Sequence, residues 1–100
     1  MTMRIAIHKE EIAGFCRRHQ IRKLALFGSV LRDDFTPESD VDVLVEFDPS
    51  ARVGLISLAG MEIELSQILG RKAELHTVRS LNPRFRDEVL AEAEVLHEQA

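Results

Sequence analysis

The segment 40–47, which reads DVDVLVEF, alternates between polar and apolar residues with a period of two. A β-strand turns successive side chains to opposite faces of its sheet, so this pattern predicts a strand with two different faces. One face carries Val41, Val43, Val45 and Phe47. The other carries Asp40, Asp42, Leu44 and Glu46. We therefore expect a fold that buries the valine face and holds two closely spaced aspartates on the other.

Helices and strands are expected to alternate along the rest of the chain. Apolar residues at helical spacing predict helices at 8–20, 55–69 and 82–96, and short apolar runs predict strands at 21–27 and 72–78. Residues 29–35 fit a brief helix after the turn at Gly28, before the turn-rich sequence TPES at 36–39. This order predicts an α+β (α/β) fold, in which helices flank a small sheet.

Two of the predicted helices have an apolar stripe that is expected to face the sheet. The helix 55–69 carries Leu55, Leu58, Met61, Leu65, Ile68 and Leu69, and the helix 82–96 carries Phe85, Val89, Ala93 and Leu96. Glu62 falls inside the first stripe and is expected to extend its carboxylate to solvent. Gly70 is well placed to end that helix. Asn82 is expected to cap the other helix, with Pro83 at its first position.

Length and composition favour one compact domain over residues 1–100, because 100 residues are few for two cores and 45% of them are hydrophobic. The net charge of −4 and the scattered basic residues disfavour direct binding of nucleic acid. No apolar run reaches the ~20 residues of a membrane span, so we expect a cytoplasmic protein. The single cysteine, Cys16, is expected to be a buried structural thiol.

Asp40 and Asp42 form the first candidate site. In an extended strand they point to the same face, with their Cα atoms roughly 6.6 Å apart. Two carboxylates suit Mg²⁺, which takes oxygen ligands and is commonly held by one or two carboxylates together with substrate phosphates. The alternative is that both residues only end a strand that faces water.

Gly28 and Ser29 form the second candidate site, at the end of the apolar run 24–27. Gly28 permits close approach of the backbone, and Ser29 stands where the next helix is expected to begin, so free N–H groups there would cradle a phosphate. Ser29 as an ordinary helix cap remains the alternative. Arg32 follows one turn later and would contact the same anion, unless it is simply solvated. Of the four histidines, only His76 is a candidate to line the site.

The segment 27–47, FGSVLRDDFTPESDVDVLVEF, resembles the signature of the nucleotidyltransferase superfamily that includes DNA polymerase β. The short chain, with GRKAEL and EVLAEAEVL near its end, is similar to the minimal nucleotidyltransferase (MNT) branch. The resemblance implies a mixed sheet flanked by helices. It also implies that Gly28, Ser29, Arg32 and Ser39 bind the nucleotide and that Asp40 and Asp42 bind the metal.

Members of this branch are commonly antitoxins that transfer AMP from ATP to a tyrosine of a HEPN-domain ribonuclease toxin. The resemblance therefore implies ATP as substrate, a two-metal Mg²⁺ site and a HEPN-type protein partner. The family has a third acidic residue, usually Asp, on the strand after the long helix, and this chain has Glu74 there. We expect Glu74 to act as a metal ligand and as the base that deprotonates the acceptor.

Two other functions use the same residues differently. A non-enzymatic binding module would neutralise or regulate a partner by contact alone. A nucleotidyltransferase for small molecules would need an added acceptor-binding domain, and nothing in these 100 residues supplies one.

Overall fold

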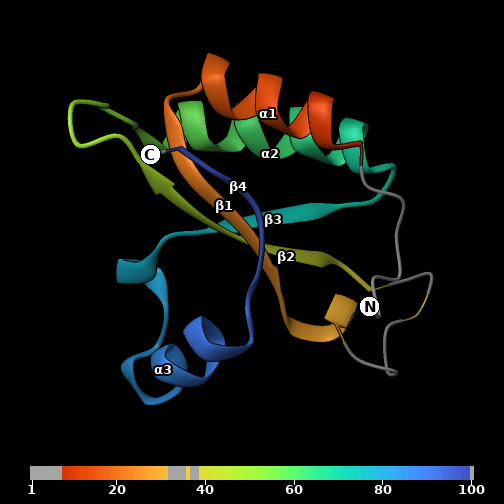
Figure 1. The fold of residues 1–100 in the computed structure, drawn as a ribbon, viewed down its shortest axis with the longest axis vertical. Coiled ribbons are helices and arrows are strands. Elements are labelled where there is room, and N and C mark those ends of the chain that lie inside the picture. The colour runs from red at the N-terminus through yellow and green to blue at the C-terminus, as the bar shows by residue number, and fades with distance from the viewer. Residues whose placement is uncertain (1–7, 32–35, 37–38, 100) are drawn as a thin grey trace.

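Four strands form one sheet in the part of the chain that the computed structural model describes, residues 8–31, 36 and 39–99 (Figure 1). They are β1 (Ile21–Phe27), β2 (Val41–Phe47), β3 (Ala73–His76) and β4 (Glu94–Glu98), in the order β3-β2-β1-β4. β1 is antiparallel to both β2 and β4, whereas β2 and β3 are parallel. The predicted small mixed sheet is confirmed.

Two helices, α1 (Lys9–Arg18) and α2 (Leu55–Leu69), lie side by side on one face of this sheet, and α3 (Pro83–Glu92) lies on the other side (Figure 1). The main core is between the sheet and the first two helices, where Ile12, Phe15 and Leu65 are fully buried. A second, smaller cluster of Phe27, Leu44 and Leu81 packs under α3. None of the helices in the described residues is long and apolar enough to cross a membrane.

β2 has the two faces that its alternating sequence predicts. Val41, Val43 and Val45 are at most 1% exposed and belong to the main core. Asp42 and Glu46 are only partly buried, on the opposite face. α3 covers only part of that face, so the carboxylates of Asp42 and Glu46 remain accessible to solvent. The candidate site lies on this accessible part of the face.

α2 ends where the sequence predicts, and most but not all of its predicted inner side chains are at least partly buried. Gly70 caps the helix with a φ of 70°. Met61, Leu65 and Leu69 are buried, and Leu58 and Ile68 pack against the core. Leu55, expected on the buried stripe, is 85% exposed because it is the first residue of the helix, one turn before the part that packs on the sheet.

Glu62 does not extend its side chain to solvent, so that prediction was wrong. Its Oε2 accepts a hydrogen bond of 2.7 Å from the backbone N–H of Leu75, and Ser66 Oγ accepts one of 2.8 Å from that of Ala73. β3 is an edge strand, whose outward N–H groups would otherwise be open to pairing with another strand. α2 therefore satisfies the open edge of the sheet with two of its side chains.

The predicted helix 82–96 is correct at its start and wrong at its end. Asn82 accepts a hydrogen bond from the backbone N–H of Arg84, with Pro83 in the first turn. The helix ends at Glu92, and Glu94–Glu98 form β4 instead. Leu96 packs against the main core from this strand, whereas Phe85 is 55% exposed. Residues 94–98 form a strand because β4 pairs antiparallel with the edge of β1 that β2 leaves free.

Cys16 is buried, as expected for a structural thiol. Burial raises its pKa to about 12, partly offset by the charge of Arg17. The reactive thiolate is thus absent at neutral pH.

Candidate active site

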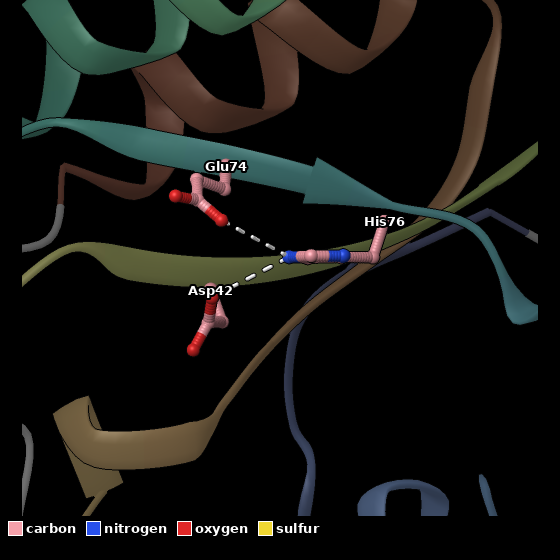
Figure 2. Close-up of side chains that lie close together, drawn as sticks. All are labelled: Asp42, Glu74 and His76. Carbon is pink, nitrogen blue, oxygen red and sulfur yellow. Dashed lines mark ion pairs between the residues drawn. The ribbon is translucent and has the colours of Figure 1, made fainter. Parts of the chain in front are cut away.

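The parallel pairing of β2 and β3 brings Asp42 and Glu74 together. Asp42 is the register partner of Glu74, and Leu44 is the partner of His76. The side chains of Asp42, Glu74 and His76 point away from the two helices of the main core and toward one another (Figure 2). Their side chains are between 30% and 41% exposed, so a ligand from solvent can reach them.

Asp40 joins this group from the residue just before β2. A hydrogen bond with Asp40 raises the pKa of Glu74, and so do desolvation and the charges of Asp40 and Asp42, while His76 acts in the opposite direction. Lys72 Nζ is 4.0 Å from Asp40 Oδ2. The three predicted metal ligands therefore lie at one place in the sheet, and like charge is concentrated there.

The donor set at this place fits a divalent cation. Carboxylate oxygens are the ligands that Mg²⁺ prefers, and a nearby cation would offset the negative charge that Asp40, Asp42 and Glu74 concentrate there. Ligand atoms of Asp42, Glu74 and His76 all lie within 4.8 Å of one another. The roles of Asp40, Asp42 and Glu74 as metal ligands stay predictions, now with a geometry that suits them.

Gly28 lies against the same carboxylate cluster. Its φ is 79°, a conformation that residues with a side chain rarely adopt. A Cβ atom placed on Gly28 would lie 2.5 Å from Oδ2 of Asp42. The glycine is therefore needed for two reasons, its backbone conformation and the space occupied by Asp42.

Ser29 follows in a 3₁₀ turn, Gly28–Leu31, whose last three residues are the described part of the helix predicted at 29–35. The rest of the predicted helix, residues 32–35, lies outside the described residues, so the helix-dipole argument for a phosphate cradle stays a prediction. The close backbone approach at Gly28 remains. Phosphate binding by Gly28 and Ser29 stays a prediction.

Ser39 makes hydrogen bonds within the segment that precedes Asp40. Its Oγ accepts a hydrogen bond of 3.0 Å from the backbone N–H of Thr36 and lies 3.1 Å from Thr36 Oγ1. Its predicted contact with the nucleotide is untested. Arg32, the remaining predicted nucleotide contact, lies outside the described residues.

His76 is the residue that the predicted site set left out. Its Nε2 lies 3.4 Å from Asp42 Oδ1 and 3.8 Å from Glu74 Oε2 (Figure 2). Alternation along the predicted strand 72–78 already placed it on the face of Glu74, as a candidate to line the site. Its contact with Asp42 depends on the pairing of β3 with β2, which the sequence of one strand does not reveal.

Comparisons with known proteins point to the same chemistry. The family model described as "Nucleotidyltransferase domain" matches residues 9–96. A Methanocaldococcus jannaschii relative, MJ0435, assigned as a protein adenylyltransferase, is 32% identical over 85 residues, which cover 85% of this chain and 89% of that protein. A solved structure assigned as a minimal nucleotidyltransferase superposes with a TM-score of 0.69 at 34% identity and covers 85% of each chain.

A more distant solved structure shares the fold. It is a complex of tri-AMPylated Shewanella oneidensis HEPN toxin with MNT antitoxin, and the match has a TM-score of 0.60. It covers 91% of this chain and 70% of the matched chain at 18% identity. At this identity the likeness shows the architecture alone.

Proposed function

Because the chain belongs to the nucleotidyltransferase domain family, as its sequence predicted, we propose that it transfers AMP from ATP to a tyrosine hydroxyl of a partner HEPN-type toxin. The modification disarms the toxin, so the chain acts as its antitoxin. One observation carries the proposal. Asp42 and Glu74 lie side by side on the accessible face of the sheet, and Asp42 lies against Gly28, where a nucleotide and metal ions would meet.

The choice of acceptor is supported by relatives. A protein assigned as a protein adenylyltransferase is 32% identical over most of both chains, and a HEPN toxin that carries AMP occurs in complex with a protein of this fold. We infer that residues 1–100 act as one domain and that the partner presents its own hydroxyl to the site. We also infer that both proteins meet in the cytoplasm, where ATP is abundant.

Asp40, Asp42 and Glu74 would hold Mg²⁺, two ions in the scheme common to this chemistry. Bound Mg²⁺ would neutralise the negative charge of the phosphates and favour the ionised form of the acceptor hydroxyl. The chain itself would bind and orient the triphosphate. The backbone at Gly28 and Ser29 would hold the triphosphate and keep the α-phosphorus close to the carboxylates.

Glu74 would take the proton of the acceptor. The tyrosine oxygen forms a bond to the α-phosphorus while the bond between that phosphorus and pyrophosphate breaks, and pyrophosphate leaves with the electron pair. The hydroxyl proton passes to the Glu74 carboxylate, which lies beside Asp42 on the accessible face. The side chain is one methylene longer than the usual Asp, so its reach from β3 is greater.

The direct test is to establish whether an adjacent gene encodes a HEPN-type protein, to express the chain with that protein and to measure the intact mass of the partner. The account predicts added AMP on a tyrosine, located by peptide mapping, and none when the chain is omitted. A stable complex whose partner never gains AMP, with purified ATP and Mg²⁺ supplied, would instead identify a binding module that neutralises by contact.

A further inference from the structure

His76 directs a ring nitrogen between two carboxylates. Nε2 lies 3.4 Å from Asp42 Oδ1 and 3.8 Å from Glu74 Oε2 (Figure 2). This nitrogen is shielded from solvent and, within the described residues, makes no well-aligned hydrogen bond. A polar atom in such a position normally has a partner, so the nitrogen is available to bind one.

The orientation of the His76 ring is fixed by its neighbours. The ring packs edge-on against Phe27, with 5.4 Å between ring centroids and 68° between ring planes. Phe27 is itself buried in the small cluster under α3. β3 is held by its parallel pairing to β2, which makes His76 the register partner of Leu44. The imidazole is thereby held in place before any ligand arrives.

The result is a set of three donors from two adjacent strands. Ligand atoms of Asp42, Glu74 and His76 lie within 4.8 Å of one another, close enough to share one ion. Mg²⁺ strongly favours oxygen ligands. An imidazole nitrogen suits first-row transition metals, and carboxylate oxygens suit Mn²⁺ among them.

We propose that Asp42, Glu74 and His76 form a mixed oxygen and nitrogen site that binds a first-row transition metal, such as Mn²⁺, in preference to Mg²⁺ and without nucleotide. The proposal deepens the proposed function, since it concerns the metal centre of the same site. Asp40 remains outside this set of three and is left to bind a metal together with the nucleotide. The site would thus hold one ion permanently and gain another with its substrate.

The first test measures metal binding by calorimetry on the purified full chain, with Mn²⁺ and Mg²⁺ in turn and no nucleotide. We expect Mn²⁺ to bind at least ~10-fold more tightly than Mg²⁺, and His76→Gln to weaken Mn²⁺ binding by roughly 10- to 100-fold. Mg²⁺ binding should change little in this variant. His8→Gln, at an exposed position outside the site, is the matched control. Equal affinities of the wild type for both ions would overturn the proposal.

A second measurement does not depend on any variant folding. Pulsed electron paramagnetic resonance of the wild type with Mn²⁺ should show coupling to a nitrogen nucleus, because the metal would be bonded to His76. Absence of that coupling in a Mn²⁺-saturated sample would show that His76 only forms ion pairs with the carboxylates. Both tests omit ATP and the partner. The metal proposal can therefore fail while Mg²⁺-supported AMP transfer succeeds, and it can succeed while that transfer fails.

Discussion

A Cβ atom on Gly28 would lie 2.5 Å from Oδ2 of Asp42, which couples the glycine turn after β1 to the central carboxylate of β2. We predict that Gly28→Ala displaces Asp42 and so weakens both Mg²⁺ binding and AMP transfer. The left-handed backbone conformation, with φ of 79°, adds a stability cost of about 1–2 kcal/mol. Metal titration and thermal unfolding of the variant measure the two effects.

Gly70 offers a matched control for this substitution. It has a similar φ of 70°, but a Cβ there would have no neighbour within 4 Å. Gly70→Ala should therefore lose similar stability while metal binding and transfer are preserved. If both variants lost transfer equally, backbone strain alone would explain the result and the close approach of Gly28 to Asp42 would be irrelevant.

Glu74 should behave as a functional carboxylate and not as an ordinary strand residue. Glu74→Gln is expected to abolish AMP transfer while nucleotide binding is nearly unchanged, since the amide is neutral and a poor proton acceptor. It should also raise the melting temperature of the metal-free protein, because the hydrogen bond with Asp40, desolvation and the charges of Asp40 and Asp42 all disfavour ionised Glu74. Single-turnover transfer and thermal unfolding in a chelator test both expectations.

Glu74→Asp restores the residue that is usual in this family and should retain or improve transfer. Misplacement of a reacting group by about one bond length can cost ~100-fold in rate, so the direction of this change shows how well the longer side chain fits. Transfer at the wild-type rate by the Gln variant would remove Glu74 from the mechanism.

Glu64 joins α2 to α1 through Arg18 and His19. It accepts a hydrogen bond from Arg18, and its Oε1 lies 2.8 Å from His19 Nε2. The hydrogen bond with Arg18, followed by that with His19, lowers the pKa of Glu64 below its usual 4.5. A carboxyl group whose pKa is lower in the folded state stabilises the fold above its unfolded pKa, and this contribution is lost as the pH falls.

We therefore predict that Glu64→Gln lowers the free energy of unfolding by about 0.2–1 kcal/mol at pH 7. The difference from the wild type should shrink as the pH falls through and below 4.5, where wild-type Glu64 becomes protonated as well. Denaturant unfolding across this pH range measures the effect, with Glu88→Gln on the exposed side of α3 as control. A constant difference at every pH would count against the ion pair as its cause.

Local sequence patterns predict much of this fold because several elements depend on nearby residues. The alternation of 40–47 gives both faces of β2, and Gly70 ends α2 where its position suggests. Residues 94–96 continue the helical spacing of the segment before them yet form part of β4, since pairing with β1 aligns Leu26 with Glu94 and Ala25 with Val95. Such pairing links residues about 70 apart in the chain, which no short window contains.

In the candidate site too, the sequence predicts some residues and misses contacts that depend on strand pairing. Gly28 and the two aspartates are recognisable from their neighbours in the sequence, whereas Glu74 was assigned from the resemblance to the family. Glu62 was misjudged because its partner is a backbone N–H of an edge strand that packs beside α2. The contact between His76 and Asp42 needs the parallel register of β3 with β2, and alternation within either strand leaves that register open.

The central claim is that Asp40 and Asp42 support transfer of AMP to a tyrosine of the partner toxin. The most direct measurement uses purified partner, Mg²⁺ and ATP labelled at the α-phosphate, with wild type compared with Asp40→Asn, Asp42→Asn and the double variant. Glu46→Gln, on the same face of β2 but paired with Arg22, is the matched control. The account predicts label on the partner with wild type and control, and a fall of orders of magnitude in both single variants. Undiminished labelling in both single variants, or neutralisation of the toxin by the double variant without any label, would contradict it.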